Sequence, residues 1–361
     1  MIHIIGIVGV PGNYGGFETL ADNLLNSAVL QRQGIIVYCE EDVAIAQKGV
    51  YKGARLRAVG WRANGWQSIF HDSVGLWWAS MTGGIILVLG TSATFWLPIL
   101  RLLFKKNRYI VNMAGLEWSR SKWGPIAKQL LRHNEAVAAI YAHEFIADNQ
   151  GLIDYVLKTY GRKAQLIAYG GDQFMNILAD HSVFQDYSLP TVYDFAMARA
   201  QIDNNLDLII EAYIRQGSHL VFVSNWDSNE YGRSVRERYK GISNLHLIGP
   251  VYDIAKVKAL HSRVRLYVHG HSAGGTNPVL VEAMWAGLPT AAYDLNFNRY
   301  TTRGQAFYFK SSTDLEYLLK SISKTSLHDC SVALRRTAEA DYRWHSVRSA
   351  YEKIILEDNQ K

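Results

Sequence analysis

The sequence predicts an α/β protein made of two Rossmann-like, doubly wound domains that face a central cleft. Three observations predict it. The chain has 361 residues, and because a single hydrophobic core rarely grows beyond about 250–300 residues, that length suits two domains. Apolar strand-like segments alternate with helical ones in both halves of the chain. Each half also carries a glycine-rich loop between a strand and a helix, where such folds bind ligands.

The first domain is expected over residues 1–175. Apolar residues recur at helical spacing from Phe17 to Val29, which predicts one helix that Gly34 stops, and a second helical stretch covers 122–142. The expected strands are short apolar runs between turn residues, at 2–9, 35–39, 56–60, 85–90, 108–113 and 164–170.

The second domain is expected over residues 190–340. Residues 179–190 show no periodicity and end in Pro190, after which the alternation starts again. Strands are expected at 193–198, 219–224, 245–249, 264–270 and 289–294, with helices at 204–217, 233–240, 253–263 and 278–287.

Composition narrows the protein class. Apolar residues make up 48% and charged residues 19% of the chain, which excludes disordered and fibrous proteins. A mean hydropathy of −0.07 argues against a polytopic membrane protein. Cys39 and Cys330 are the two cysteines, so a disulfide framework or cysteine metal cluster is excluded. The first ten residues predict a strand rather than a signal peptide, and we expect a cytoplasmic location.

The net charge of +6 suits acidic ligands such as nucleotide phosphates, or an anionic membrane surface. Residues 85–104 are long enough to span a membrane, but Gly90, Pro98 and Arg101 interrupt them, which favours a buried strand followed by a loop and a helix. Aromatic and apolar residues nearby lie close to basic ones, a mixture that suits peripheral contact with the inner face of the cell membrane; core packing is the alternative reading. These residues are Trp77, Trp78, Phe95, Trp96, Leu103, Phe104, Lys105, Lys106 and Arg108.

The first glycine-rich loop, residues 9–18, joins the first strand to the first helix. Glycine lets an anion approach backbone N–H groups closely, and the helix N-terminus favours negative charge. Gly15 and Gly16 together exceed what a single turn needs, although the glycines could serve a tight turn alone. The spacing is not that of a dinucleotide-binding fingerprint.

The second loop, residues 269–278, again joins a strand to a helix. Asn277 is the expected N-cap and Pro278 the first helical residue, so the loop forms the amino end of a helix. Gly274 and Gly275 expose backbone there, and Thr276 adds a hydroxyl group. His269 and His271 flank the loop, either as structural residues or as ligand contacts.

Two charged residues stand out beside these loops. Glu282 lies in a helix that is apolar nearly all round, so its carboxylate needs either a Lys or Arg partner or a ligand's hydroxyl groups. Arg199 follows a strand, where a guanidinium would match the oxygens of a bound diphosphate, and a salt bridge is the alternative.

These residues resemble those of the retaining GT-B glycosyltransferases of family 4, and more narrowly the bacterial rhamnosyltransferase-like (DUF1972) branch. The matching strings run from the first strand to the last helix, so the resemblance covers essentially the whole chain. They are GVPGNYGGFETLADNL, NMAGLEWSRSKW, IADNQGLIDYV, IAYGGD, ARAQIDNNLDLIIEAY, HGHSAGGTNPVLVEAMWAGLP and YRWHSVRSAYEKI.

The resemblance implies roles for named residues. The N-terminal domain would take the acceptor and the second domain the nucleotide sugar, while 341–361 would form a helix crossing back to the N-terminal domain. Arg199, Glu117 and Asp172 are the implied catalytic residues. The implied donor-binding residues are Gly15, Gly16, Arg199, Asn205, His271, Gly274, Gly275, Thr276, Asn277 and Glu282.

Three positions depart from the family pattern. Gly274 replaces the first glutamate of the E-x7-E pair, a loss that the branch shares. Asn204 stands where many members carry lysine, and Ala114 where the branch often has aspartate. Asn204 in place of lysine lowers the positive charge expected at the diphosphate, and Ala114 in place of aspartate removes a carboxylate expected near the acceptor.

The resemblance implies transfer of a hexose, rhamnose or another 6-deoxyhexose, with retention, in capsule or O-antigen biosynthesis. The donor would be a nucleotide-diphosphate sugar such as dTDP-rhamnose, and the acceptor a saccharide or lipid-linked saccharide. No cofactor, metal ion or nucleic acid is expected. Two alternatives stay open: a nucleotide-sugar epimerase of similar fold, and a catalytically decayed donor-binding partner.

Overall fold

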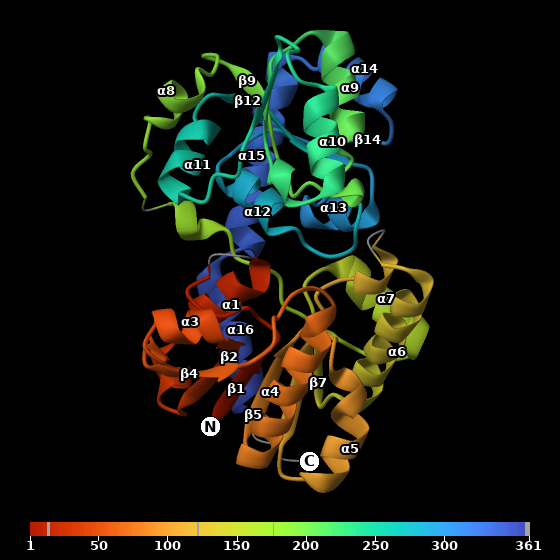
Figure 1. Cartoon of the computed structure of the whole chain (residues 1–361). Helices are drawn as coiled ribbons and strands as arrows, with labels where there is room; N and C mark the ends of the chain where they lie inside the picture. The colour runs from red at the N-terminus through yellow and green to blue at the C-terminus, as the bar shows by residue number, and fades with distance from the viewer. Residues whose placement is uncertain (13–14, 121–122, 176, 358–361) are drawn as a thin grey trace. The chain divides into compact units, whose positions relative to one another are not determined.

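The computed structural model describes residues 1–12, 15–120, 123–175 and 177–357, so residues 13–14 of the first glycine-rich loop and 121–122 lie outside it. The chain divides into two compact units (Figure 1). Unit 1 comprises Met1–Ser119, Trp123–Tyr169 and Trp344–Lys361, and unit 2 comprises Arg120–Lys122 and Gly170–Arg343. Both segments of unit 2 are therefore insertions in the sequence of unit 1.

Unit 1 is built on an eight-stranded sheet with the order β3-β4-β2-β1-β5-β6-β7-β8. Its strands run parallel except for the β3–β4 pair, which is antiparallel. The strands are β1 (Ile2–Ile5), β2 (Ile35–Glu40), β3 (Val50–Tyr51), β4 (Ala54–Val59), β5 (Ile85–Leu89), β6 (Arg108–Asn112), β7 (Glu144–Ala147) and β8 (Gln165–Leu166).

The helices of unit 1 connect and cover these strands. They are α1 (Gly16–Leu24), α2 (Ala28–Gln31), α3 (Glu41–Ala46), α4 (Ser68–Thr82), α5 (Leu97–Leu103), α6 (Pro125–Tyr141), α7 (Gln150–Tyr160) and α16 (Trp344–Leu356). Three short 3-10 helices are η1 (Gly65–Gln67), η2 (Thr94–Trp96) and η3 (Glu117–Ser119).

The last helix, α16, belongs to the core of unit 1 and lies against α1 (Figure 1). Trp344, Val347 and Tyr351 are buried in the same apolar cluster as strand residues of the sheet. The side-chain amide of Asn112 donates to the hydroxyl of Tyr351 over 2.7 Å. The buried Arg108 donates to the backbone carbonyls of Ile355 and Glu357, which anchors the end of the helix.

Unit 2 is built on a six-stranded parallel sheet with the order β11-β10-β9-β12-β13-β14. Its strands are β9 (Tyr193–Met197), β10 (Leu220–Val223), β11 (Leu245–Ile248), β12 (Val264–His269), β13 (Thr290–Tyr293) and β14 (Phe307–Phe309).

The helices of unit 2 enclose a second core. They are α8 (Val183–Tyr187), α9 (Leu206–Gln216), α10 (Glu230–Arg238), α11 (Ile254–His261), α12 (Pro278–Trp285), α13 (Asn296–Thr301), α14 (Ser312–Ser321) and α15 (Lys324–Asp341). The 3-10 helices are η4 (Asp172–Phe174), η5 (Ile202–Asn204) and η6 (Trp226–Ser228).

The expected single helix from Phe17 to Val29 is wrong, because α1 ends at Leu24 and α2 begins at Ala28. Ser27 explains the break, since its hydroxyl accepts the backbone N–H of Leu30 over 3.1 Å and caps a new helix. The expected strands of both halves are present, whereas β3, β7 and β14 were not predicted from the sequence.

Each sheet has one point at which the strand order reverses. In unit 1, β1 lies between β2 and β5, and in unit 2, β9 lies between β10 and β12. The loops that leave such neighbouring parallel strands diverge at the carboxyl edge of the sheet and leave room for a ligand. The first glycine-rich loop follows β1, and the second follows β12.

Candidate functional site

In unit 2 the reversal point brings together the segments that follow β9 and β12. Arg199 lies two residues beyond β9 and its side chain is exposed. The loop 270–277 follows β12 and leads into α12. Gly270 is essential for this approach, because a Cβ there would lie 2.2 Å from the carbonyl oxygen of Asn204. The structure therefore places Arg199 and the second glycine-rich loop just after two neighbouring strands, β9 and β12.

Asn204 connects these two segments. It is buried, and its side-chain amide donates to the carbonyl of Arg199 over 2.7 Å. Its Oδ1 lies 2.8 Å from Nδ1 of His271. At the position that carries lysine in many family members, this chain thus has an uncharged side chain that connects Arg199 to His271 by hydrogen bonds. The sequence reading treated Asn204 as a lost charge and missed this role.

His271 is held as a neutral acceptor. Burial lowers its pKa well below the ordinary value, and nearby His269, Arg120 and Arg199 act in the same direction. Because the amide of Asn204 is oriented by Arg199, its Oδ1 must accept from Nδ1–H of His271, which leaves Nε2 with a lone pair. Such a ring can accept a hydrogen bond from a ligand hydroxyl.

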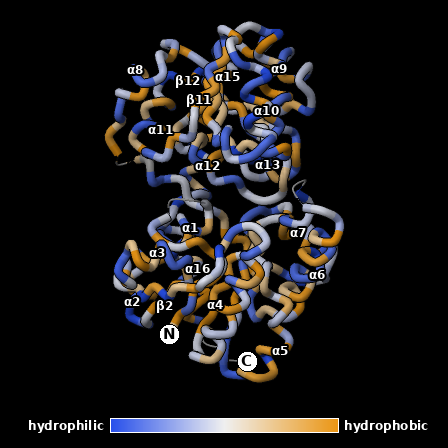
Figure 2. Tube along the Cα trace, viewed as in Figure 1, coloured by the Kyte–Doolittle hydropathy of each residue, from blue (hydrophilic) through white to orange (hydrophobic). Residues whose placement is uncertain are grey.

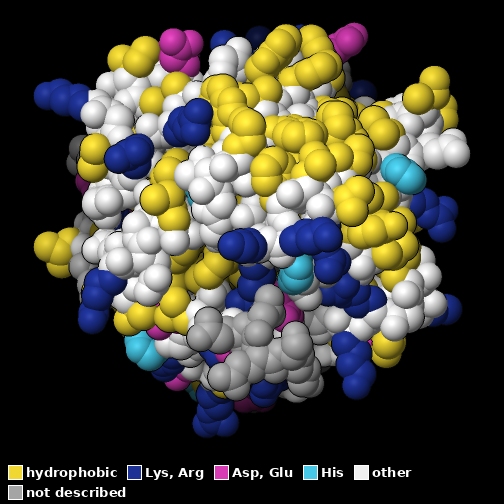
Figure 3. All heavy atoms as spheres, turned by 90° about the horizontal axis from the view of Figure 1, so that it is seen from below, with side chains coloured by type: hydrophobic (Ala, Val, Ile, Leu, Met, Phe, Trp, Pro, Cys, Tyr) yellow, Lys and Arg dark blue, Asp and Glu magenta, His cyan; other side chains and the backbone are white. Residues whose placement is uncertain are grey.

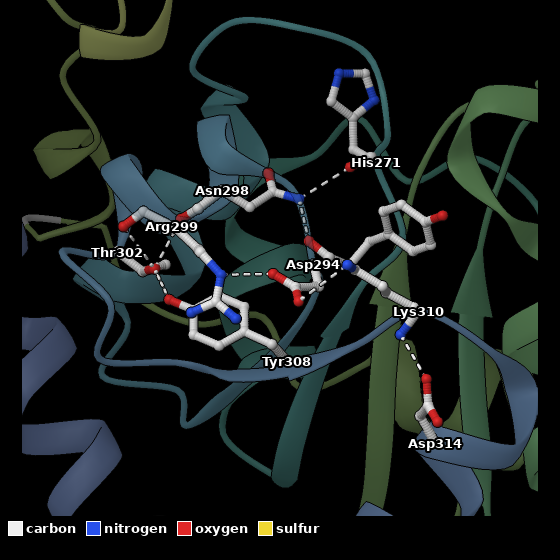
Figure 4. Close-up of polar contacts among 9 residues, drawn as sticks. His271, Asp294, Asn298, Arg299, Thr302, Tyr308, Lys310 and Asp314 are labelled. Carbon is white, nitrogen blue, oxygen red and sulfur yellow. Dashed lines mark hydrogen bonds and ion pairs between the residues drawn. The ribbon is translucent and has the colours of Figure 1, made fainter.

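Further contacts fix the loop that carries His271. The side-chain amide of Asn298 in α13 points to the carbonyl of His271 and donates to it over 2.9 Å (Figure 4). Asn205 donates from its side chain to the carbonyl of Gly270 over 2.7 Å. Asn205 is one of the donor-binding residues that the resemblance implies, and in the structure its side chain, like that of Asn298, positions backbone.

His269 is more deeply buried than His271. It is 3% exposed, burial lowers its pKa to about 3, and its Nδ1 lies 3.4 Å from the hydroxyl of Tyr267. Its Nε2 has no hydrogen-bond partner among the residues that the structure describes. The imidazole is therefore neutral at physiological pH.

The amino end of α12 is formed as the sequence predicts. Asn277 is the N-cap, its Oδ1 accepts the backbone N–H of Val279 over 3.1 Å, and Pro278 follows as the first helical residue. Gly275 has a φ of +108° and is buried together with Thr276, whereas Gly274 is half-buried. The unpaired N–H groups of a helix start make this end electropositive.

Glu282 lies one turn further along α12 and is half-buried. Burial raises its pKa to about 8, against which a hydrogen bond from Gln173 acts. That bond, from Nε2 of Gln173 to Oε1 of Glu282, measures 2.7 Å. Within the described ranges, no Lys or Arg forms a salt bridge with Glu282. The Lys or Arg partner that the sequence offered for this carboxylate is therefore not found among these residues.

Asp172 comes next to Gln173 in η4, which packs on α12. Gly171 precedes it, and a Cβ at Gly171 would lie 2.6 Å from Trp285. The backbone N–H of Gly171 and the indole N–H of Trp285 both donate to the carbonyl of Tyr342 over 2.9 Å. Asp172 is thus held half-buried beside the helix that carries Glu282.

In unit 1 the first glycine-rich loop leads into α1, with Gly15 as the N-cap. Glu18 turns back onto this end: its Oε1 accepts the backbone N–H of Val8 over 3.0 Å, and its Oε2 lies 2.8 Å from where a Cβ of Gly15 would be. A cavity of about 260 Å³ adjoins the loop. It is lined by Val8, Gly9, Pro11, Glu18, Asp42, Val43, Ala46 and Gln47.

The segment after β6 carries Glu117 and Ala114. Glu117 is half-buried in η3, and its Oε1 accepts the indole N–H of Trp123 over 3.0 Å. Ala114 is exposed and has a φ of +62°, a left-handed conformation that alanine adopts at a cost. Asn and Asp tolerate that conformation better, which fits the aspartate of the branch.

Replacing Ala114 with glycine is expected to stabilise the protein by about 0.5–1 kcal/mol, because glycine removes the left-handed penalty. Thermal unfolding would measure this as a rise in Tm of a few degrees. Ala340→Gly is the matched control, since Ala340 is exposed inside α15 and glycine there should cost about 1 kcal/mol. Equal losses for both variants would contradict the assignment of strain to Ala114.

Another group at the carboxyl edge of unit 1 was not foreseen as a site. Trp61, Trp66 and Phe70 follow β4 and are 43%, 65% and 47% exposed. The rings of Trp61 and Phe70 stack with centroids 5.0 Å apart, and Trp66 meets Phe70 edge-on at 6.0 Å. We call these three residues the aromatic platform. The cluster of Trp and Phe in residues 61–70 was the available sequence signal.

The aromatic platform adjoins a buried polar group. Asp72 in the second turn of α4 contacts Nδ1 of the buried His71 over 3.0 Å and accepts a hydrogen bond from Ser92. Ser92 lies in the loop that leaves β5. This contact fixes the start of α4, and hence Phe70, against the strand next to β1.

Among the described residues, no three His, Cys, Asp or Glu side chains are arranged to hold a metal ion. In the same part of the chain, none of the helices is both long and apolar enough to cross a bilayer.

Comparison with known proteins adds two findings. A family model described as a domain of unknown function, DUF1972, matches residues 78–172, well under half of the chain. No curated protein matches the sequence. The DUF1972 resemblance is thereby confirmed over that segment, while the rhamnosyltransferase assignment remains a prediction.

Solved structures match over nearly the full length. Sucrose-phosphate synthase from Thermosynechococcus elongatus matches with a TM-score of 0.76 at 13% identity, covering 98% of this chain and 97% of that one. Anabaena HepE in complex with UDP and glucose matches with a TM-score of 0.74 at 13% identity, covering 99% of both chains. WaaG, a glycosyltransferase involved in lipopolysaccharide biosynthesis, matches with a TM-score of 0.70 at 14% identity, covering 99% of this chain and 100% of that one. The chain thus has the two-domain α/β fold with parallel sheets that is known as GT-B.

Proposed function

We propose that the protein is a glycosyltransferase that moves a sugar from a nucleotide-diphosphate donor to a sugar hydroxyl. The observation that carries this proposal is the grouping at the reversal point of unit 2. There an exposed guanidinium, a helix N-terminus, a neutral imidazole and a carboxyl group follow two neighbouring strands. The full-length likeness to HepE, whose structure contains UDP and glucose, supports a donor of this chemical class.

Each group of this site has a task in the proposed complex. Arg199 and the N-terminus of α12 would neutralise the diphosphate, because both are electropositive. His271 would accept a hydrogen bond from a sugar hydroxyl through Nε2. Glu282 would accept hydrogen bonds from the two ribose hydroxyls. The side-chain amide of Gln173 already donates to Oε1 of Glu282 and so orients the carboxyl group. In unit 1, Gly15 and Gly16 would offer backbone N–H groups to the donor phosphates, with Glu18 beside them.

The proposed step retains the configuration of the sugar. The bond between the anomeric carbon and the β-phosphate oxygen breaks, and its electron pair leaves with the diphosphate. The acceptor oxygen bonds to the same face of that carbon, and its proton passes to the departing phosphate oxygen. The products are the glycoside and a nucleoside diphosphate. Preorganised donors that meet the leaving charge would supply about 2–4 kcal/mol each, and no divalent ion is required.

The sugar and pathway are proposed from the sequence resemblance. We propose that the transferred sugar is a hexose, and within that class rhamnose or another 6-deoxyhexose. The donor substrate for rhamnose would be dTDP-rhamnose. The acceptor would be a saccharide on a lipid carrier in the assembly of a surface polysaccharide such as capsule or O-antigen. Glu117 and Asp172 are kept as candidate groups near the reacting atoms, since both are half-buried carboxylates on short 3-10 helices.

The aromatic platform is our candidate surface for the acceptor. Exposed apolar groups of this size are unusual on a soluble surface and mark binding sites. Ring faces suit the C–H faces of a sugar, while their edges leave its hydroxyls in water. The platform lies at the carboxyl edge of unit 1, which is the edge where the first glycine-rich loop also leaves its sheet.

Trp66→Ala is expected to raise the acceptor KM about tenfold, which corresponds to the loss of about 1.4 kcal/mol of binding. The turnover number and the affinity for the donor nucleotide should stay within twofold. Initial-rate kinetics with varied acceptor would measure the change. Tyr317→Ala is the control, because Tyr317 is 74% exposed on α14 of unit 2. A lowered turnover with an unchanged acceptor KM would contradict this acceptor surface.

The proposed function is tested by a thermal-shift screen of nucleotide sugars followed by a transfer assay with EDTA present. We expect one donor to raise Tm, since a ligand that binds only the folded state stabilises it. That donor should be consumed only when an acceptor is added. Conversion of the donor alone would indicate an epimerase. Donor binding without turnover across a panel of lipid-linked acceptors would indicate a decayed enzyme, and a strict need for divalent ions would overturn the metal-independent step.

A further inference from the structure

The helix α5 carries apolar side chains on opposite sides. Leu97 and Leu100 are buried, whereas Ile99, Leu102 and Leu103 are 46%, 69% and 58% exposed. The exposed three have the i, i+3, i+4 spacing of one helical stripe. Figure 2 shows α5 in the colour of hydrophobic residues. Exposure of a contiguous apolar stripe to water is energetically unfavourable, and such stripes mark sites of interaction with a partner or a membrane.

The stripe is part of a larger apolar area at the amino edge of the unit 1 sheet. The helices α4, α5 and α6 each end just before a strand, β5, β6 and β7. Met81, Ile140 and Tyr141 lie at the ends of α4 and α6 and are 60%, 61% and 38% exposed. We call these six residues the apolar face: Met81, Ile99, Leu102, Leu103, Ile140 and Tyr141. Figure 3, which views the molecule from that end, shows hydrophobic side chains gathered together with Lys and Arg around them.

Contacts between the helices hold this area together. The guanidinium of Arg101 donates to the carbonyl of Tyr141 over 2.9 Å and thereby joins α5 to α6. The ring of Trp77 on α4 meets Trp96 and Phe104 edge-on at 5.4 and 6.4 Å. These three aromatic rings are half-buried. The sequence offered core packing and surface contact as alternatives for them, and the region combines the two.

The charge around the apolar face is predominantly positive, although the half-buried Glu144 at the start of β7 lies 3.7 Å from Arg108. Residues 73–116 include no Asp or Glu, whereas Lys105 and Lys106 are exposed directly after α5. Lys163 is exposed as well, next to Arg162, which donates to the carbonyl of Ala139 in α6. Arg108, which the sequence grouped with these cations, is wrong for that role, because it is buried and bonded to the carbonyls of α16.

We propose that the apolar face docks on an anionic phospholipid surface, with Lys105, Lys106 and Lys163 at the headgroups. Aliphatic side chains at the acyl boundary together with lysines near anionic headgroups are the two components of reversible interfacial binding. A protein partner usually requires a polar rim of both charges around the apolar core of an interface. Here the described rim consists of three exposed lysines and one acidic side chain, the half-buried Glu144, so an anionic lipid surface fits it better. The proposal does not rest on the proposed catalytic function.

Docking through this edge leaves the other edge of the sheet open. The strands of unit 1 between β2 and β8 are parallel, so the ends of α4, α5 and α6 lie at the amino edge. The first glycine-rich loop and the aromatic platform lie at the carboxyl edge. A membrane under the apolar face would therefore not cover the acceptor surface.

Flotation with lipid vesicles tests the proposal on the full chain. One set of vesicles is phosphatidylcholine alone, and the other contains about 30% phosphatidylglycerol. We expect the protein to bind the anionic vesicles at least tenfold more strongly, with binding reduced in high salt, since one lysine near an anionic surface contributes roughly fivefold. No binding to either vesicle, or equal binding to both, would overturn the proposal.

Variants separate the two components. Leu102→Gln with Leu103→Gln should lower binding at least tenfold, and Lys105→Glu with Lys106→Glu should abolish the preference for anionic vesicles. Matched controls are Ile45→Gln with Leu178→Gln, which are 68% and 91% exposed elsewhere, and Lys240→Glu with Lys353→Glu. All four sites of the test variants are exposed, and unchanged Tm would show that the variants fold.

A second copy of the chain is the rival occupant of the apolar face. Sedimentation velocity without lipid distinguishes it: a dimer that the Leu102 and Leu103 substitutions convert into a monomer would overturn lipid docking. A monomeric wild type that floats with anionic vesicles supports it.

Discussion

Arg199→Ala is expected to lower turnover by a factor of about 100–1000 while leaving the fold unchanged, which is the loss seen when one preorganised donor to a developing charge is removed. The side chain of Arg199 is exposed, and it is its backbone carbonyl that accepts the amide of Asn204. Truncation of the side chain therefore removes charge at the proposed diphosphate and leaves the Asn204 contact intact. Steady-state kinetics and thermal unfolding of the same preparation would measure both quantities.

Controls define what this result means. Arg199→Lys should recover part of the activity, because the charge remains while the two-pronged guanidinium geometry is lost. Arg236→Ala on α10 is the matched control, since Arg236 is also exposed and its partner is the surface residue Asp227. Turnover within threefold of wild type in Arg199→Ala would remove Arg199 from the diphosphate site.

The stability difference between the wild type and Glu282→Gln is expected to depend on pH. Burial raises the pKa of Glu282 in the folded protein to about 8, above the ordinary value of 4.5. The folded state therefore favours the protonated carboxyl. The stabilising contribution of this proton is complete below pH 4.5 and is lost as the pH rises through 8. Each pKa unit corresponds to about 1.4 kcal/mol, and partial exposure reduces the total to roughly 2 kcal/mol.

Thermal unfolding of both proteins between pH 5 and pH 8.5 would measure this difference. The wild type should lose several degrees of Tm relative to the glutamine variant over that interval, because an amide does not titrate. If Glu282 accepts ribose hydroxyls as a carboxylate, the nucleotide should also bind more tightly as the pH rises from 6 to 8, and the variant should lack that trend. A Tm difference that stays constant with pH would contradict the raised pKa.

Periodicity and glycine placement predicted much of the fold. Long buried parallel strands such as β5 and β6 are continuous apolar runs, so they were recognised from the sequence with their approximate limits. β3, β7 and β14 were missed because two to four residues are too few to establish a strand pattern between helices and loops. The break at Ser27 was missed because the apolar spacing continues across it, and the cap that ends the pattern is a local hydrogen bond.

The candidate site was predictable in its backbone and less so in its side chains. The N-cap at Asn277 and the need for glycine before α12 follow from helix chemistry, and both are present. The bond between Gln173 and Glu282 joins residues 109 positions apart, so no local pattern could reveal it. Asn204 illustrates the same limit, because its role depends on Arg199 and His271 meeting from different strands.

The order in which the chain leaves the ribosome has a consequence for how the two units mature. All residues of unit 2 have been synthesised before Trp344, whereas the core of unit 1 still lacks Trp344, Tyr351 and Ile355. Until these residues arrive, the groove against α1 exposes apolar surface, and Asn112 lacks its tyrosine partner. Unit 2 can thus complete its folding once Arg343 has left the ribosome, while the domain that begins the chain is the last to close. A released chain that ends at Arg343 should accordingly resist protease over unit 2 and be cleaved within unit 1.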